Sequence, residues 1–140
     1  MRLYIFILLS LQIGFAQAEY PKDYFGAPLD IPLVLSGTFA ELRSNHFHSG
    51  LDLKTQQRTG LKVFAAADGY VSRIKISHYG YGKALYVTHP NGYTTVYAHL
   101  KKFGDAIETY IKECQYEKES YEVEVFPQPK ELPILSLIHI

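Results

Sequence analysis

The sequence has a single cysteine, no tryptophan and no excess of either charge. Cys114 stands alone among 140 residues, so an intrachain disulfide is impossible. The 14 basic residues balance 14 acidic ones, which gives no electrostatic basis for binding nucleic acid or an anionic membrane surface. Internal repeats and low-complexity tracts are also lacking. A chain of this length is sufficient for one domain with a modest core.

The residues that are abundant favour β-structure. Twelve tyrosines, eight phenylalanines and ten glycines are typical of strands joined by tight turns. Strand signals are strongest from Val63 to Leu100, and helical spacing predicts one short helix over residues 105–118. The predicted fold class is therefore mainly β, an antiparallel sheet with one short helix after a central hairpin.

The first 18 residues have the pattern of a secretory signal peptide. Arg2 supplies the positive start, residues 3–15 are almost continuously apolar, and Ala16-Gln17-Ala18 fits the small-x-small cleavage rule. The apolar stretch is shorter than the ~20 residues that a membrane-spanning helix needs. We expect cleavage between Ala18 and Glu19, a secreted or periplasmic protein, and no membrane span after cleavage.

The dipeptide Asn91-Gly92 predicts the central hairpin, because it is the strongest short signal for a two-residue turn. Such a turn would place Tyr86 opposite Tyr97 and fix which side chains of the returning strand face the core. Val96 would then point inward. The outward face would consist of Tyr93, Thr95, Tyr97 and His99.

Two flanking segments are also predicted from pattern. Residues 19–32 contain three prolines, which favours an extended arm laid over the domain. Residues 119–126 alternate Glu with Tyr and Val, as an exposed strand does. His78 and His89 are expected at a surface loop and at the hairpin tip.

Residues 45–53, NHFHSGLDL, concentrate two histidines and an aspartate in one short stretch. Two ligands of one zinc ion lie ~3 to 3.5 Å apart, whereas residues four apart in a straight strand are separated by ~13 Å. His48 and Asp52 can therefore share a metal only if the chain bends between them, and Ser49-Gly50 suits a bend. The spacing alone also fits a solvated polar loop. His46 is expected to have a structural role or to support the metal ligands without binding the metal itself.

Three stretches together resemble the M23 family of lysostaphin/LytM-type zinc endopeptidases: NHFHSGLDLKT, VFAAADGYVSRI and YGKALYVTHPNGYTTVYAHL. The resemblance extends over roughly residues 30–134. It implies an antiparallel sheet domain of that type, with His48 and Asp52 as ligands of Zn²⁺ and His99 in YAHL as a catalytic residue. It also implies that the protein hydrolyses the peptide cross-links of bacterial peptidoglycan. Peptidoglycan peptides would then be its substrate and binding partner.

The second motif of that family, His-x-His, does not occur in this sequence. It would supply a further catalytic histidine and the third zinc ligand, and the histidine that follows His99 is His139 in LSLIHI. We expect a truncated chain with a signal peptide at 1–18, a partial M23-like peptidase domain with its N-terminal arm at 19–134, and a non-native tail at 135–140. The tail is what CTG TCT CTT ATA CAC ATC encodes, a string that resembles a sequencing-library adapter. The fragment itself is expected to be inactive.

Two alternative functions remain open from the sequence. One is a non-catalytic LytM-like regulator of cell-wall hydrolases. Such relatives usually lose zinc ligands, so the presence of His48 and Asp52 speaks against this alternative, whereas the missing third ligand leaves it open. The other is a cupin-like metal-binding barrel, because HFHSGLD also contains His-x-His followed by an acid. The sequence indicates neither the oligomeric state nor which cross-link is cut.

Overall fold

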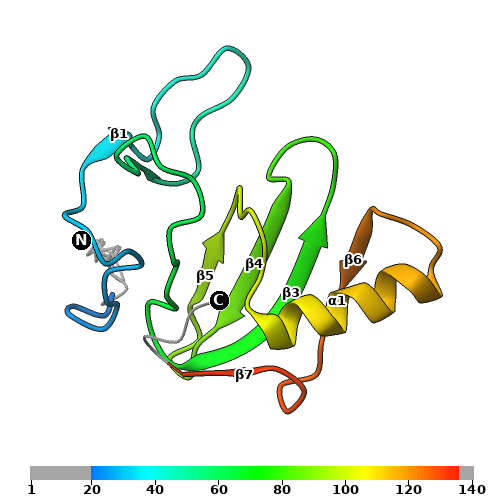
Figure 1. Cartoon of the computed structure of the whole chain (residues 1–140). Coiled ribbons are helices and arrows are strands. Elements are labelled where there is room, and N and C mark those ends of the chain that lie inside the picture. Colours follow the sequence, from blue (N-terminus) through cyan, green and yellow to red (C-terminus); the bar gives the residue numbers. More distant parts are fainter. Residues whose placement is uncertain (1–19, 136–140) are drawn as a thin grey trace, which may run out of the picture.

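The computed structural model describes residues 20–135, and its main element is a five-stranded antiparallel sheet (Figure 1). The strands are β3 (Gly69–Ile76), β4 (Lys83–Thr88), β5 (Thr94–Tyr97), β6 (Val123–Val125) and β7 (Pro133–Ile134). Their order is β5-β4-β3-β6, and β7 pairs with the beginning of β3. A separate two-stranded ribbon pairs β1 (Leu35–Gly37) with β2 (Asp52–Leu53). The predicted fold class, mainly β with one short helix, is confirmed.

The helix α1 (Asp105–Glu117) lies across one face of the sheet (Figure 1). Ile107 and Ile111 are its buried residues and pack into the core. Asp105 and Glu108 place negative charge in the first turn, where it interacts favourably with the positive end of the helix dipole. The Glu108 carboxylate also accepts a hydrogen bond from the backbone N–H of Phe103 at 3.1 Å. The predicted helix over residues 105–118 is confirmed to within one residue.

The core lies between α1 and the sheet, and β3 contributes three of its buried side chains. Val71, Ile74 and Ile76 are buried, although the first two are three residues apart and strict alternation would put them on opposite faces. The pairing of β3 with β4 shifts between Val71 and Arg73. This irregularity adds a residue to β3 and returns the apolar side chains to the core face.

The hairpin between β4 and β5 is paired one residue away from the predicted register. Leu85, not Tyr86, lies opposite Tyr97. The connection spans residues 89–93 and is closed by a hydrogen bond from His89 N to Tyr93 O at 2.9 Å, so it is longer than a two-residue turn. Tyr97 consequently faces the core at 9% exposure, whereas Val96 is 47% exposed. The predicted inward and outward faces of this strand were wrong.

The segment that precedes β1 packs as an extended arm, as its prolines predict. Gly26 N donates to Ala66 O at 2.7 Å, and Phe64 N donates to Pro28 O at 2.9 Å. Residues 63–67 therefore bond to the arm through an isolated bridge. The sequence had predicted a strand of the sheet over these residues, and that prediction was wrong.

The predicted exposed strand over residues 119–126 is shorter than expected. It is limited to β6, which pairs with β3, so Val123 is buried. The expected signal peptide at 1–18 and all but the first residue of the expected tail at 135–140 lie outside the described residues. Between residues 20 and 135, no helix is both long and apolar enough to span a bilayer.

Candidate active site

His48 and Asp52 converge at the end of the β1–β2 ribbon where the loop over residues 38–51 connects the two strands. The chain bends at Gly50 before Asp52 begins β2. As a result, His48 Nε2 lies 3.3 Å from Asp52 Oδ1, within the ~3 to 3.5 Å that separates two ligands of one zinc ion. The bend that the sequence required at Ser49-Gly50 is present. Whether the two side chains bind a metal stays a prediction.

The orientation of the His48 ring is fixed from its other nitrogen. His48 Nδ1 lies 3.0 Å from the backbone carbonyl of Thr38, so Nδ1 carries the proton that it donates. In the neutral ring, Nε2 then directs a lone pair at the Asp52 carboxylate. Two electron-rich atoms at this distance need a proton or a cation between them. A backbone carbonyl behind the ring is also the usual support of a metal-binding histidine.

The second oxygen of Asp52 is bound by an arginine. Arg43 Nη2 lies 2.7 Å from Asp52 Oδ2 and 3.2 Å from Glu41 Oε2. The hydrogen bond from Arg43 holds the pKa of the Asp52 carboxyl below its ordinary value, and the nearby His48 and His99 act in the same direction. Asp52 is therefore a carboxylate at neutral pH, as a metal ligand must be.

His99 is exposed and lies after the end of β5. Its backbone has a φ of 57°, in the left-handed region, so its direction does not follow from strand alternation. His99 N donates to Tyr81 O at 3.0 Å, and the two rings meet edge to face at 6.3 Å. The Tyr81 hydroxyl also lies 2.8 Å from Ser49 Oγ. Tyr81 thus links the segment that carries His99 to the segment that carries His48 and Asp52.

A catalytic zinc ion normally has three protein ligands, and the described residues bring together two candidate ligands, His48 and Asp52. Among residues 20–135, no group of three or more His, Cys, Asp or Glu side chains could hold a metal ion. His46 is exposed and bonds to the neighbouring Asn45 side chain at 2.6 Å, and its expected structural or supporting role stays a prediction. His139 lies outside the described residues. His48 and Asp52 therefore fit part of a zinc site, and their donor chemistry is appropriate for it.

His89 is not the exposed hairpin-tip residue that the sequence predicted. It is 3% exposed, with Nδ1 2.7 Å from Asp68 O and Nε2 2.8 Å from Thr95 Oγ1. The Phe25 ring of the N-terminal arm packs edge to face against it at 5.2 Å. Both ring nitrogens are hydrogen-bonded within the protein, so His89 joins the arm to the hairpin rather than binding a ligand.

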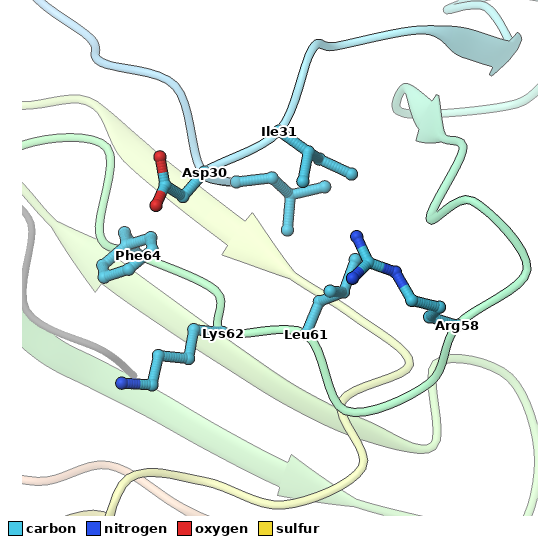
Figure 2. A pocket seen from close by; sticks show the side chains of 7 residues that line it. Asp30, Ile31, Arg58, Leu61, Lys62 and Phe64 are labelled. Carbon is cyan, nitrogen blue, oxygen red and sulfur yellow. The ribbon is translucent and has the colours of Figure 1, made fainter.

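A shallow pocket elsewhere on the molecule does not contain any of the predicted site residues. It lies between the N-terminal arm at Asp30 and Ile31 and the segment from Arg58 to Phe64 (Figure 2). Asp30, Arg58 and Lys62 are the charged side chains of its lining, and apolar side chains form the rest. The candidate active site is therefore an open surface between loops and not this hollow.

Two residues of the site were missed by the sequence reasoning, Arg43 and Tyr81. Arg43 precedes the histidine motif, but its contact with Asp52 depends on how β1 pairs with β2. Tyr81 belongs to the glycine-containing loop YGYG, and its contacts reach segments about 20 and 30 residues away in sequence. The clustering of glycine and tyrosine was the available signal for a functional loop there.

Comparison with known proteins identifies the family of the chain. The family model described as "Peptidase family M23" matches residues 46–115, half of the chain, and the match includes His48, Asp52 and His99. Proteins named "DD-carboxypeptidase/endopeptidase Mpg" from Neisseria meningitidis serogroup B and Neisseria gonorrhoeae are 40% identical over 65 residues. That segment is 46% of this chain and 14% of each relative, so the chain spans a small part of their length. No solved structure gives a significant match. The chain belongs to peptidase family M23.

Proposed function

We propose that the full-length protein is a zinc-dependent endopeptidase that hydrolyses the peptide cross-links of bacterial peptidoglycan. The observation that carries this proposal is the convergence of His48 Nε2 and Asp52 Oδ1 at 3.3 Å, with His99 close enough to influence the pKa of that carboxyl. Membership of the family and the relatives named endopeptidases support the reaction class. The predicted signal peptide supports export to the periplasm or beyond, where peptidoglycan lies.

His48 and Asp52 would hold the zinc ion, together with a third ligand that we place outside the described residues. A zinc ion in such a site polarises a peptide carbonyl and lowers the pKa of water to about 7. The Thr38 carbonyl holds the proton of His48 on Nδ1, which leaves the lone pair of Nε2 available for a metal ion. Arg43 keeps the Asp52 carboxyl ionised. Both contacts prepare the pair before any ion arrives.

His99 would transfer protons during the reaction or donate a hydrogen bond to the oxyanion. Its ring is exposed, and its backbone is held by Tyr81, which also bonds the loop that carries His48. An imidazole so placed can take a proton from an attacking water and pass it to the leaving amine, or donate a hydrogen bond to the developing oxyanion. The exposed position leaves room for a peptide to approach.

The experiment that tests the proposal is cleavage of purified muropeptides by the full-length protein. His48→Ala and Asp52→Ala should each abolish zinc binding and cleavage, while His78→Ala should not affect either. His78 is a suitable control because it stacks on Tyr121 at 4.7 Å and takes no part in the site. Cleavage that survives in the His48 or Asp52 variant would refute the assignment.

A second candidate is a non-catalytic regulator that binds cell-wall hydrolases or glycan. The observation that favours it is the presence of only two adjacent donors, His48 and Asp52, within residues 20–135. Elemental analysis of the full-length protein separates the two functions, since the enzyme requires one zinc per chain and the regulator none. The cupin alternative loses its support, because the described strands form one sheet with a ribbon and not a closed barrel.

A further inference from the structure

The two oxygens of the Asp52 carboxylate have different partners. Oδ1 faces His48 Nε2 at 3.3 Å, and Oδ2 accepts a hydrogen bond from Arg43 Nη2 at 2.7 Å. Charge-assisted contacts of this kind are short and directional. With Oδ2 engaged, the carboxylate has a single oxygen that is directed toward the imidazole.

The charge of Arg43 is shared between two carboxylates. The same Nη2 atom that binds Asp52 lies 3.2 Å from Glu41 Oε2, and Glu41 also accepts from Thr38 N at 3.2 Å. Thr38 is the residue whose carbonyl supports His48. Glu41 therefore offsets the positive charge of Arg43 beside the site and connects it to the support of the histidine.

Space for the pair comes from a glycine on the opposite strand of the ribbon. Gly37 of β1 is the register partner of Asp52 in β2, next to an irregularity between Leu35 and Gly37. A Cβ atom on Gly37 would lie 2.5 Å from Asp52 Oδ2 and 2.6 Å from Arg43 Nη2. Real Cβ contacts are not this short, so any side chain at position 37 would displace one or both groups. Gly37 is not among the residues with positive φ, so its backbone accepts alanine.

We propose that Arg43 is a positioning residue that holds Asp52 as a one-oxygen metal ligand, and that Gly37 is required because it leaves room for the Arg43–Asp52 pair. The inference rests on the proposed zinc site and adds two residues to it. Neither residue touches substrate or metal. Both act by fixing where Asp52 Oδ1 lies before the ion binds.

The expected effect is a loss of zinc affinity without a comparable loss of stability. Removing a partner that orients a metal ligand typically lowers metal affinity by about 10- to 100-fold. Arg43→Gln should lose affinity within this range, and Arg43→Lys should recover part of it by restoring a cation near Oδ2. Gly37→Ala should also lose affinity, because the atoms it would meet are the mobile ends of two side chains and can move without unfolding the ribbon.

The test has two measurements on the full-length protein, with Arg58→Gln as the matched control. Arg58 is exposed, and its guanidinium bonds to the Gln56 side chain at 2.7 Å, away from the site. Competition with a chromophoric chelator measures the zinc affinity. Three-bond couplings across the Asp52 Cα–Cβ bond, recorded by NMR in the metal-free protein, measure whether its side chain is held in one rotamer.

Three results decide the matter. The inference is supported if the couplings show one Asp52 rotamer in the wild type and in Arg58→Gln but an average over several rotamers in Arg43→Gln and Gly37→Ala. These last two variants should also bind zinc more weakly than the wild type. Unchanged couplings, or zinc affinity equal to or above that of the wild type in both variants, would overturn it. A wild-type protein that orders Asp52 but does not bind zinc would instead refute the proposed function, and the ordering of Asp52 by Arg43 would stand.

Discussion

Replacing Tyr97 with phenylalanine tests the register of the central hairpin. The Tyr97 hydroxyl accepts hydrogen bonds from Ala66 N at 2.8 Å and from Thr95 Oγ1 at 3.0 Å, and the residue is 9% exposed. Tyr97→Phe removes the acceptor and leaves the Ala66 amide unpaired. A donor left unsatisfied in this way costs about 1–3 kcal/mol.

Equilibrium unfolding in urea measures this loss. With a slope of about 2 kcal/mol/M, a loss of about 2 kcal/mol lowers the urea midpoint by roughly 1 M at constant slope. Tyr86→Phe is the control, because Tyr86 lies on the opposite face of the hairpin with Arg73 4.6 Å from its ring centre. The control should stay within about 0.5 kcal/mol of the wild type. If Tyr97→Phe behaved like the control, Tyr97 would face solvent as a two-residue turn requires, and the described register would be wrong.

Three further predictions concern the core, the catalytic residue and pH. Phe103 is fully buried, so Phe103→Ala should lower the free energy of unfolding by about 3–5 kcal/mol, measured by thermal unfolding. Phe126 is 64% exposed, so the control Phe126→Ala should change this free energy little. Equal losses in the two variants would contradict the described core. In the full-length protein, His99→Ala should retain zinc and lose about 10²- to 10⁴-fold in kcat, and an unchanged kcat would exclude its proposed role. Arg43 and the histidines hold the pKa of Asp52 below 3.8, so the ionised carboxylate stabilises the fold above that pH, and this stabilisation disappears as pH falls through the lowered pKa. The stability gap between the wild type and Asp52→Asn should therefore narrow in urea titrations below pH 3.8, and a constant gap would show that Asp52 has no favourable partner in the fold.

The mainly β class and the helix were predictable because both depend on local patterns. Ile107 and Ile111 have helical spacing, and both are buried in α1. The hairpin was located by Asn91-Gly92 but not its register, since a two-residue turn and a five-residue connection fit the same sequence. The core decides between them by burying Tyr97 with its hydroxyl bonded to Ala66, a contact between segments 31 residues apart. No local pattern reports such a contact.

Some features of the candidate site were likewise predictable from local sequence, whereas others depend on the fold. The proximity of His48 and Asp52 followed from a short spacing and a bend at Gly50, which are local properties of the sequence. The contacts of Arg43 depend on the β1–β2 pairing, and those of His99 on a left-handed backbone conformation. His89 was misplaced because a histidine in a hairpin connection is usually exposed, whereas here the Phe25 ring of the arm covers it. Sequence patterns thus locate the donors, and the contacts that orient them come from the fold.

The most direct test of the zinc site is an anomalous difference map, recorded at the zinc absorption edge from crystals of the full-length protein. We predict a peak about 2.0–2.2 Å from both His48 Nε2 and Asp52 Oδ1, with Asp52 Oδ2 still bound to Arg43. Absence of a peak at this position in zinc-saturated crystals, or zinc bound by other residues only, would contradict it.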